Sequence, residues 1–535
     1  MNQFFTHWTR AAARRLLPLL LLTPLLPGRA SQAQTTAPYG WQWATGLTTT
    51  STMWGRALAR DAAGNLYVTG WYNGAGTQST AALPTVAPYD QNFNYNTGLY
   101  LAKLNATGAV QWTTTLNGPG EDGGTRVAVD ASGNVYVAGR LSGPQTIGSS
   151  SLPGLPGRQS YTFLAKFNSS GVAQWGVQGV FSGDLGNTWH TPNALAVDAA
   201  GNVYAGMGGV TKYDAAGTVL WNTPMAGLVQ SLSMGSQGQV VAAGSFAGNG
   251  VFGTGAGAVT LSSQAGQLPN GFTAQLSSAG SLQWAKAAVC TGKVYNMDAT
   301  PDAAGNVYAL GSTNGGNGLI QFGSTSVSGQ TYLAKYSSTG NLVWAQDVTG
   351  TPGDYSRAAV TTATGTTYIG ASGRIMAIDA AGTQQWTRHD NLERVFALVP
   401  NGNDELYVAG NYRNSGGTAG SIILAGNGTS AGLSAFVGKL SNTATASRPA
   451  QLAQWSVYPN PNGTGLLHLR AAAPLSGPAR LVLTNALGQV VKNTAVPAMP
   501  GAWRYDWPVQ DLPKGLYVVQ LSTGQGRQST RVVLE

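Results

Sequence analysis

Two groups of side chains have chemistry that could serve a ligand, and both lie in segments between repeated motifs. Acidic residues follow glycine in Gly120-Glu-Asp122, Gly183-Asp184 and Gly353-Asp354, and Trp189 lies near the second of these. Clustered carboxylates can hold Ca²⁺, and single carboxylates can cap turns. Aromatic rings can stack on sugars or anchor a long loop. The aromatic candidates share one segment: Trp71, Tyr72, Tyr89, Phe93 and Tyr95.

The cysteine and histidine content limits the kinds of metal and catalytic site that the chain can form. Cys290 is the only cysteine, so an internal disulfide and a cysteine-based zinc site are both excluded. Four scattered histidines make a metal constellation improbable, and no nucleophile–base pair stands out. We therefore expect no catalytic residue and no cofactor, with Ca²⁺ as the one metal that the acidic residues would suit.

The net charge of +9 is concentrated at the two ends of the chain. The first 34 residues hold four Arg and no acid, and residues 448–535 hold eight basic and three acidic residues. The middle of the chain has seventeen of each sign and is neutral. A repeat region that binds nucleic acid is therefore not expected.

The elements that must position the candidate residues are short repeated strands. Residues 127–139 alternate apolar and smaller side chains on both sides of Asp130-Ala-Ser-Gly-Asn134, and Gly139 is expected to end the second strand. Two further strands follow, at residues 161–167 and 172–175. Four antiparallel strands joined by hairpins are typical of one blade of a β-propeller.

The repeat occurs seven times by counts of the turn motif and of the third strand. The fourth strand carries a Trp only six times after a third strand, at Trp112, Trp175, Trp221, Trp284, Trp344 and Trp386. Trp43, near the start of the chain, is left over. A ring closes when the last sheet takes a strand from the other terminus, which removes its exposed edge. We therefore predict a seven-bladed β-propeller over residues 34–440, with residues near 39–46 closing the last blade and the seven Trp packing the blades.

Loop lengths divide the predicted ring into two faces. The loops between strands one and two and between strands three and four are uniformly tight. All length variation lies in the other two loop classes, which emerge on the opposite face. We expect an extra hairpin in each of the long inserts there. The candidate acidic and aromatic residues lie in these variable loops, where function tends to be placed on a rigid scaffold. We call this side the decorated face and the other the plain face.

The Asp-Ala-Ala-Gly-Asn-x-Tyr turn, with Leu-Ala-Lys-Tyr and a later Trp, resembles the bacterial β-propeller repeat proteins of the SBBP type. The two shortest repeats, at residues 212–221 and 377–386, also resemble the quinoprotein blade. In quinoproteins this motif packs the blades together and does not bind the quinone. The resemblance implies a fold and leaves the activity open, because propellers host many functions.

The two ends predict a route of export. Residues 1–33 have a basic start, the apolar run Leu16–Leu26 and small residues before a cleavage point, which is typical of a secretory signal. The apolar run is short for a membrane span, so we expect no transmembrane segment in the mature chain. Residues 441–454 form a polar linker.

Residues 455–535 have five or more short strands separated by Gly/Pro turns, which predicts a small β-sandwich. This segment resembles the type A C-terminal sorting domain of the type IX secretion system. Asn485, Arg531 and Glu535 depart from the usual pattern of that family. The matching positions are Tyr458, Pro459, Asn460, Pro461, Gly488, Gly515 and Tyr517.

The sorting domain implies the type IX secretion machinery as partner. It also implies passage through the periplasm to the surface or surroundings of a Gram-negative bacterium. The expected function is a non-catalytic propeller that binds an extracellular glycan or protein. The alternative is an extracellular propeller enzyme, either a polysaccharide lyase or hydrolase or a quinoprotein-like oxidoreductase.

Overall fold

In the part of the chain that the computed structural model describes, the regular elements are β-strands and one short 3₁₀ helix, η2 (Gly255–Gly257), so the all-β prediction is confirmed. The predicted signal segment and most of the predicted linker lie outside the residues that the structure describes. Within the described residues, no helix is long and apolar enough to cross a membrane. The described residues are 39–78, 81–86, 97–118, 120–155, 160–181, 194–264, 268–314, 319–348, 358–428, 432–442, 455–471, 479–485, 489–497, 503–523 and 526–535.

Seven antiparallel sheets of four main strands occupy the described residues from Tyr39 to Asn442. We number them in chain order. Sheet 1 contains β2 (Thr52–Arg60), β3 (Leu66–Gln78), β5 (Gly98–Leu104) and β6 (Val110–Leu116), and β4 (Ala81–Val86) also pairs with β3. Sheet 2 contains β7 (Gly123–Val129), β8 (Val135–Ser142), β11 (Ser160–Phe167) and β12 (Ala173–Phe181). Sheet 3 contains β13 (Leu195–Val197), β14 (Val203–Gly206), β15 (Val210–Tyr213) and β16 (Val219–Thr223).

The remaining sheets follow the same order until the last. Sheet 4 contains β17 (Leu228–Met234), β18 (Val240–Phe246), β21 (Asn270–Leu276) and β22 (Leu282–Ala288). Sheet 5 contains β23 (Lys293–Pro301), β24 (Val307–Asn314), β27 (Thr331–Tyr336) and β28 (Leu342–Asp347). Sheet 6 contains β29 (Ala358–Thr361), β30 (Thr367–Gly370), β31 (Arg374–Ile378) and β32 (Gln384–His389). Sheet 7 contains β33 (Arg394–Asn401), β34 (Glu405–Arg413), β37 (Leu433–Asn442) and β1 (Tyr39–Leu47).

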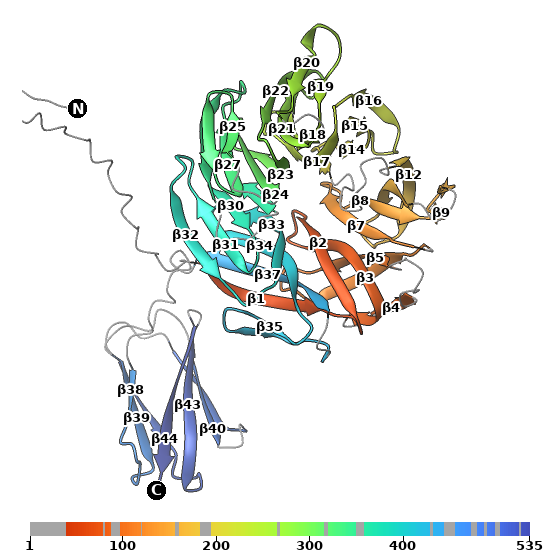
Figure 1. The fold of residues 1–535 in the computed structure, drawn as a ribbon. Helices are drawn as coiled ribbons and strands as arrows, with labels where there is room; N and C mark the ends of the chain where they lie inside the picture. Colours follow the sequence, from red (N-terminus) through yellow and green to blue (C-terminus); the bar gives the residue numbers. More distant parts are fainter. Residues whose placement is uncertain are drawn as a thin grey trace, which may run out of the picture. The chain divides into compact units, whose positions relative to one another are not determined.

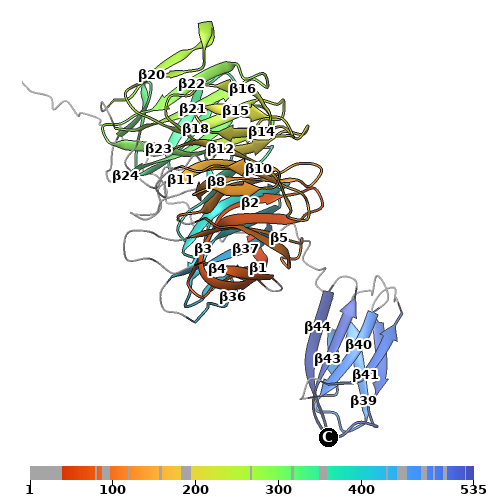
Figure 2. The ribbon, with the colours of Figure 1, turned by 90° about the vertical axis from the view of Figure 1, so that its right-hand side faces the viewer.

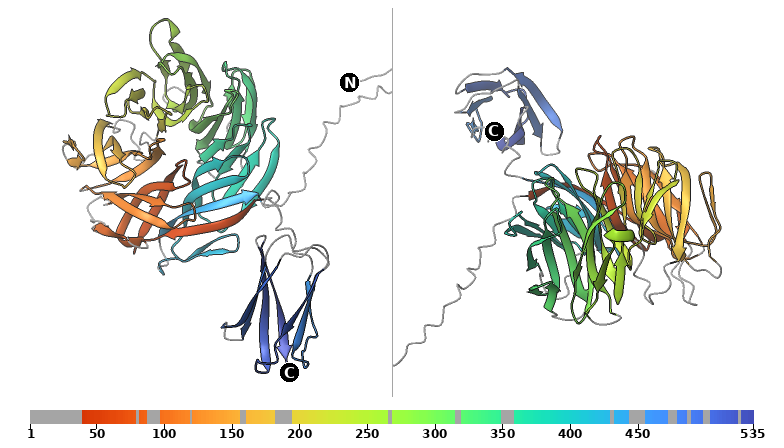
Figure 3. Two further views of the ribbon diagram at one scale, coloured as in Figure 1. Left: turned by 180° about the vertical axis from the view of Figure 1, so that it is seen from behind. Right: turned by 90° about the horizontal axis from the view of Figure 1, so that it is seen from above.

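The seven sheets contact one another in a closed circle. The first strand of each sheet contacts the next sheet, and β2 of sheet 1 also contacts β33, β34 and β37 of sheet 7. Figure 1 shows the sheets around a common centre, with the first strand of each sheet innermost, and Figure 3 shows the same ring from behind and from above.

Within the described residues, four inserts between the second and third strands form separate two-stranded hairpins. Each hairpin contacts the outermost strand of its own sheet, as β10 does with β12 and β20 with β22. Figure 2 shows the hairpin that contains β20 projecting beyond sheet 4. The hairpins are β9 (Gln145–Ile147) with β10 (Ser150–Leu152), β19 (Asn249–Phe252) with β20 (Val259–Ser262), β25 (Leu319–Phe322) with β26 (Thr325–Ser328), and β35 (Gly417–Ala419) with β36 (Ile422–Leu424).

The repeated turn motif is held by its own side chains. In sheet 1, Asp61 Oδ1 accepts the backbone N–H of Asn65 (2.8 Å), and Asp61 Oδ2 accepts Asn65 Nδ2 (2.8 Å) and the Tyr67 hydroxyl (3.0 Å). The same bonds recur at Asp130, Asp198 and Asp302. The intervening Gly64 has φ +85°, which glycine adopts without steric cost. The motif is therefore a self-contained structural turn.

The repeated Trp, and in several sheets the repeated Lys, join one sheet to the next. Lys166 Nζ lies 5.5 Å from the centre of the Tyr136 ring and donates to the carbonyl of Ala215 in sheet 3 (2.9 Å). Trp175 Nε1 donates to the same carbonyl (3.1 Å), and its ring covers Gly217, where a Cβ would come within 3.1 Å of it. The positive-φ glycine of the next sheet is covered in the same way by Trp43, Trp112, Trp221, Trp284 and Trp344. We call this arrangement the sheet joint.

The terminal strand β1 completes sheet 7. It pairs antiparallel with β37, and Trp43 stands opposite Lys439. Because sheet 7 takes this strand from the other end of the chain, it lacks the usual turn for Trp386 to cover. Tyr39 takes that place, with its ring centre 4.9 Å from the Trp386 ring and its hydroxyl donating to Asn403 O (2.5 Å).

The C-terminal segment forms two further antiparallel sheets (Figure 1). One contains β38 (Trp455–Tyr458), β39 (Leu466–Ala471) and β42 (Trp503–Pro508). The other contains β41 (Val490–Val496), β40 (Ala479–Asn485), β43 (Gly515–Thr523) and β44 (Gly526–Leu534). The two sheets share one apolar core, in which Leu467, Leu469 and Trp507 of the first meet Leu481 and Val519 of the second.

Candidate functional site

The innermost strands of five sheets carry a β-bulge near their decorated-face end. In β2 the pairing with β3 shifts between Gly55 and Ala57, so that Arg56 is the extra residue. Bulges of this kind redirect side chains and are frequent near functional sites. The extra residues are Arg56 in β2, Thr125 in β7, Gln230 in β17, Met297 in β23 and Phe396 in β33.

The bulges explain why Gly139 is a glycine, although the sequence analysis predicted that it ends a strand. β8 continues through Gly139 to Ser142, which corrects the expectation that Gly139 terminates it. A Cβ on Gly139 would collide with the carbonyl of Gly123, and one on Gly410 would collide with the carbonyl of Arg394. Glycine is required here because the bulged strand approaches the neighbouring backbone closely.

Where sheets 1 and 7 meet, the innermost strands β2 and β33 and the adjacent strand β3 bring aromatic rings and arginines together. The rings of Trp54 and Trp71 are stacked, with centres 5.3 Å apart and planes 17° apart. Phe396 lies 5.5 Å from Trp54. The guanidinium carbons of Arg56 and Arg394 lie 5.7 and 5.6 Å from the centre of the Trp54 ring. We call these five residues the cation–aromatic cluster.

The cluster is partly open to solvent and contains two arginines. Phe396 is buried at its base, whereas Trp54, Arg56, Trp71 and Arg394 are partly exposed. The neighbouring acid Glu393 forms an ion pair with Arg413 (3.0 Å). Among the described residues, the guanidinium of Arg394 has no carboxylate partner. Exposed aromatic faces beside guanidinium groups can stack on a ligand and bind its anionic groups.

A second group of polar residues crosses the centre of the ring. Arg126 Nη2 donates to Gln230 O (3.3 Å), and Ser231 Oγ donates to Asp298 Oδ1 (2.5 Å). Asp298 Oδ2 accepts the backbone N–H of Ala359 (3.2 Å). Burial raises the pKa of Asp298 and lowers that of Arg126, and each charge counteracts the shift of the other. These bonds link sheets 2, 4, 5 and 6, so we regard them as structural.

Of the candidates proposed from the sequence, Trp71 is the one that the structure places in the cation–aromatic cluster. Tyr72 is fully buried, and Asn117 Nδ2 donates to its hydroxyl oxygen (3.2 Å), so it anchors its segment. Tyr89, Phe93, Tyr95, Asp184, Trp189 and Asp354 lie outside the described residues.

Asp122 is also an anchor in this structure. It is 2% exposed, and its carboxylate accepts the backbone N–H groups of Gly118 and Ser142 and the Ser142 hydroxyl (2.8 Å). Burial raises the pKa of Asp122 to about 6, against the opposing effect of these hydrogen bonds. Within the described residues, no group of three or more His, Cys, Asp or Glu could hold a metal ion.

Sequence reasoning missed Trp54, Arg56, Arg394 and Phe396. They lie on first strands whose apolar alternation resembles that of the other repeats. One signal in the sequence could have indicated two of them. Arg56 and Phe396 occupy the same bulge position as Thr125 and Gln230, and this position varies within an otherwise repeated unit.

The motif residues of the C-terminal segment tie its start to its last strands. Asn460 Oδ1 accepts the N–H of Val533 (2.9 Å), and its amide group donates to Arg531 O (2.9 Å). The Tyr517 hydroxyl donates to Pro513 O (2.7 Å), and Gly515 has φ +155°. Pro459 and Pro461 follow cis peptide bonds, and Gly488 lies outside the described residues.

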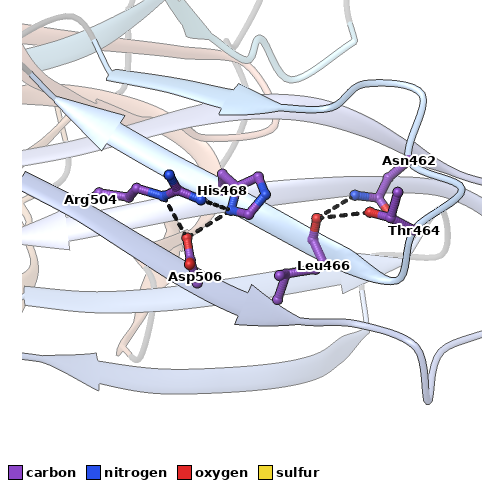
Figure 4. A network of polar contacts seen from close by, with 6 residues as sticks. All are labelled: Asn462, Thr464, Leu466, His468, Arg504 and Asp506. Carbon is purple, nitrogen blue, oxygen red and sulfur yellow. Dashed lines mark hydrogen bonds and ion pairs between the residues drawn. The ribbon is translucent and has the colours of Figure 1, made fainter.

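One face of the sheet β38–β39–β42 carries an exposed polar network, shown in Figure 4. Asp506 Oδ1 accepts Arg504 Nε (2.9 Å) and lies 2.7 Å from His468 Nδ1. The hydrogen bonds and charges of His468 and Arg504 lower the pKa of Asp506. The Tyr458 ring lies 5.4 Å from the His468 ring and is 38% exposed.

Comparison with known proteins places the C-terminal segment in a family. Residues 456–535 match the family described as the secretion system C-terminal sorting domain. This segment implies the type IX secretion machinery and indicates export to the cell surface or the extracellular space. A search of curated proteins found no match.

The described ring is similar to solved β-propellers. The Dos1 propeller is 11% identical, with a TM-score of 0.41, over 76% of this chain and 96% of that one. The Neurospora crassa Pan2 WD40 domain is 10% identical, with a TM-score of 0.39, over 75% and 97%. XC5397 from Xanthomonas campestris, titled a gluconolactonase, is 11% identical, with a TM-score of 0.29, over 57% and 90%. Likeness at this level carries no information about function.

Proposed function

We propose that this chain is a seven-bladed β-propeller of the SBBP type, followed by a C-terminal β-sandwich that directs its export through the type IX system. The seven sheets in circular contact and the recurring sheet joint support the blade count. The shared core of the two C-terminal sheets supports the sandwich.

We further propose that the exported ring binds an extracellular ligand without turning it over, a glycan in the first place and a protein as the alternative. The cation–aromatic cluster carries this proposal. It offers partly exposed aromatic and guanidinium surface on the decorated face, whereas the repeated polar residues are bonded within turns and sheet joints.

Binding is tested with the purified full-length chain on an array of neutral and acidic glycans, followed by chain-length measurement of any bound glycan. We expect binding that Trp71→Ala weakens at an unchanged melting temperature, with the bound glycan left intact. Binding that survives Trp71→Ala would remove the cluster from the proposal, and shortened glycan would show an enzyme.

Export is tested by deleting residues 456–535. We expect the truncated chain to accumulate in the periplasm as a folded ring, and a secreted reporter fused to these residues to appear outside the cell. Normal amounts of the truncated chain outside the cell would show that the segment is not needed for export. The network at His468 offers a milder variant, Asp506→Asn, for mapping contacts with the machinery.

A further inference from the structure

The two sheets of the C-terminal sandwich differ in the face that each turns away from the shared core. In the sheet β38–β39–β42 the outward side chains are mostly polar. Arg504 and Asp506 form the ion pair drawn in Figure 4, and Arg470 is exposed. Apolar and polar positions therefore alternate along these strands, as expected for an antiparallel sheet with one face in water.

The four-stranded sheet β41–β40–β43–β44 carries apolar residues on both of its faces. Its inward residues, such as Leu483, Val519 and Val532, belong to the core. Side chains alternate along a strand, so the residues between them point outward. Several of the outward residues are also apolar: Val482, Val490, Leu516, Val518 and Val533. Strands with near-continuous apolar sequence are typical of sheets that are covered on both faces.

The outward apolar residues form one patch across all four strands. Val518 of β43 stands opposite Thr484 of β40, which in turn stands opposite Val490 of β41. Leu516, also on β43, stands opposite Val533 of β44. Leu516 is 47% exposed and Val490 is 58% exposed. We call Val482, Val490, Leu516, Val518 and Val533 the outer apolar patch.

The surroundings of the outer apolar patch resemble those of a protein interface. Gln520 stands opposite Val482, and Arg531 stands opposite Val518. The patch is therefore an apolar centre with polar residues at its border, which is the usual anatomy of a surface that binds another protein. Apolar side chains in water contribute none of the free energy that their burial would provide, and a contiguous exposed patch of them is typical of an interaction site.

The family match indicates which partner covers the patch. Residues 456–535 match a secretion system sorting domain, which implies the export machinery as partner. Of the two outward faces, the apolar one removes more apolar surface from water when it is covered. Building on the proposed role of this segment in export, we propose that the outer apolar patch is the surface by which the type IX machinery binds the chain. The partner presents an apolar protein surface, and Val518 lies at the middle of the contact.

The test measures export of the full-length chain from cells, with Val518→Lys as the main variant. A lysine at the middle of the patch would lose its hydration against an apolar partner. We expect the extracellular amount to fall about tenfold or more, while folded chain accumulates in the periplasm. Val518→Thr keeps the shape and the strand propensity but adds a hydroxyl, and should fall between wild type and Val518→Lys. Ser456→Lys introduces the same charge at an exposed position of the other sheet and should be exported like wild type.

Normal export of Val518→Lys would overturn the assignment of the patch. If deletion of residues 456–535 still blocks export in that case, the proposed export role stands; if the deleted chain is exported too, that role fails as well. An equal loss with Ser456→Lys would mean that any added charge interferes, and the assignment to this face fails.

Two further measurements on the purified chains keep the result decisive. If Val518→Lys melts well below wild type, Val518→Thr decides: reduced export at the wild-type melting temperature supports the patch, and normal export overturns it. The oligomeric state separates the machinery from a second copy of the chain as partner. A wild-type dimer that becomes monomeric with Val518→Lys would assign the patch to the second copy and overturn the machinery as its partner.

Discussion

The sheet joints and the centre of the ring are built from the same repeated strands but use them differently. At the joints, Asp, Tyr, Lys, Trp and a positive-φ Gly recur from sheet to sheet and bond to one another or to the next sheet. At the bulges of the innermost strands, the equivalent position holds Arg56, Thr125, Gln230, Met297 or Phe396. The positions that repeat maintain the ring, whereas the bulge positions differ from sheet to sheet, and the partly exposed Arg56 at one of them belongs to the proposed ligand site.

The largest expected effect comes from removing the strand that closes the circle. Deleting residues 39–47 removes Trp43 from the joint at Gly108 and Tyr39 from the joint at Trp386, and leaves β37 with an unpaired edge. Trp43 is partly buried, so its ring contributes less than the roughly 4–5 kcal/mol that full burial of a Trp would give. We expect aggregation or a much lower melting temperature by calorimetry. A melting temperature equal to that of wild type would show that the circle does not depend on β1.

Much of the ring could be predicted from the sequence because its determinants are local. The turn at Asp61 and Asn65 is bonded within itself, and the strands on either side alternate regularly. The centre could not be predicted in the same way. The contact from Arg126 to Gln230 joins residues 104 positions apart, and nothing near either residue indicates the other. The bulge at Arg56 becomes visible only when β2 is paired with β3.

A smaller effect is expected from one methyl group at a single joint. Gly340 has φ +79°, and a Cβ there would come within 2.7 Å of the Trp284 ring. Gly402 has φ +64° but would meet nothing within 4 Å. Both alanine substitutions carry the backbone cost of about 1–2 kcal/mol, and Gly340→Ala adds the clash with Trp284. We expect Gly340→Ala to lower the free energy of unfolding by at least about 1 kcal/mol more than Gly402→Ala in urea titrations. Equal losses would mean that the Trp ring moves aside at no cost.

The decorated face also contains Asp122, whose contribution to the stability of the fold should depend on pH. The folded pKa of Asp122 is about 6, above its ordinary value of 3.8. The folded chain therefore binds this proton more tightly than the unfolded chain does. The resulting stabilisation is complete below about pH 4 and is lost as pH rises through 6.

Asp122→Asn removes this titration while other acids, such as Asp61, remain in both proteins. The advantage of wild type over Asp122→Asn in unfolding free energy should therefore be greater at pH 4 than at pH 7, by about 1–3 kcal/mol. Urea titrations of both proteins at the two pH values measure the difference. An advantage that grows with pH would reverse the sign and show that the carboxylate is stabilised as an anion.

The smallest expected effect on stability is that of Trp71→Phe in the cation–aromatic cluster. The same substitution at Trp284, in a sheet joint, provides the direct comparison between the two regions. Trp284→Phe at a joint removes the bonds that its Nε1 donates to Ser338 O (3.1 Å) and Gln275 Oε1 (2.6 Å), and shortens a ring that is 6% exposed. We expect a loss of about 2–3 kcal/mol in unfolding free energy. Trp71→Phe removes part of a ring that remains partly exposed, and should cost about 1 kcal/mol or less. Its consequence should appear in glycan affinity, which Trp284→Phe should leave unchanged below its melting temperature. If Trp71→Phe destabilises the chain as much as Trp284→Phe and leaves binding intact, the cation–aromatic cluster is another joint, formed where sheets 1 and 7 meet. In that case the ligand must be sought elsewhere on the ring.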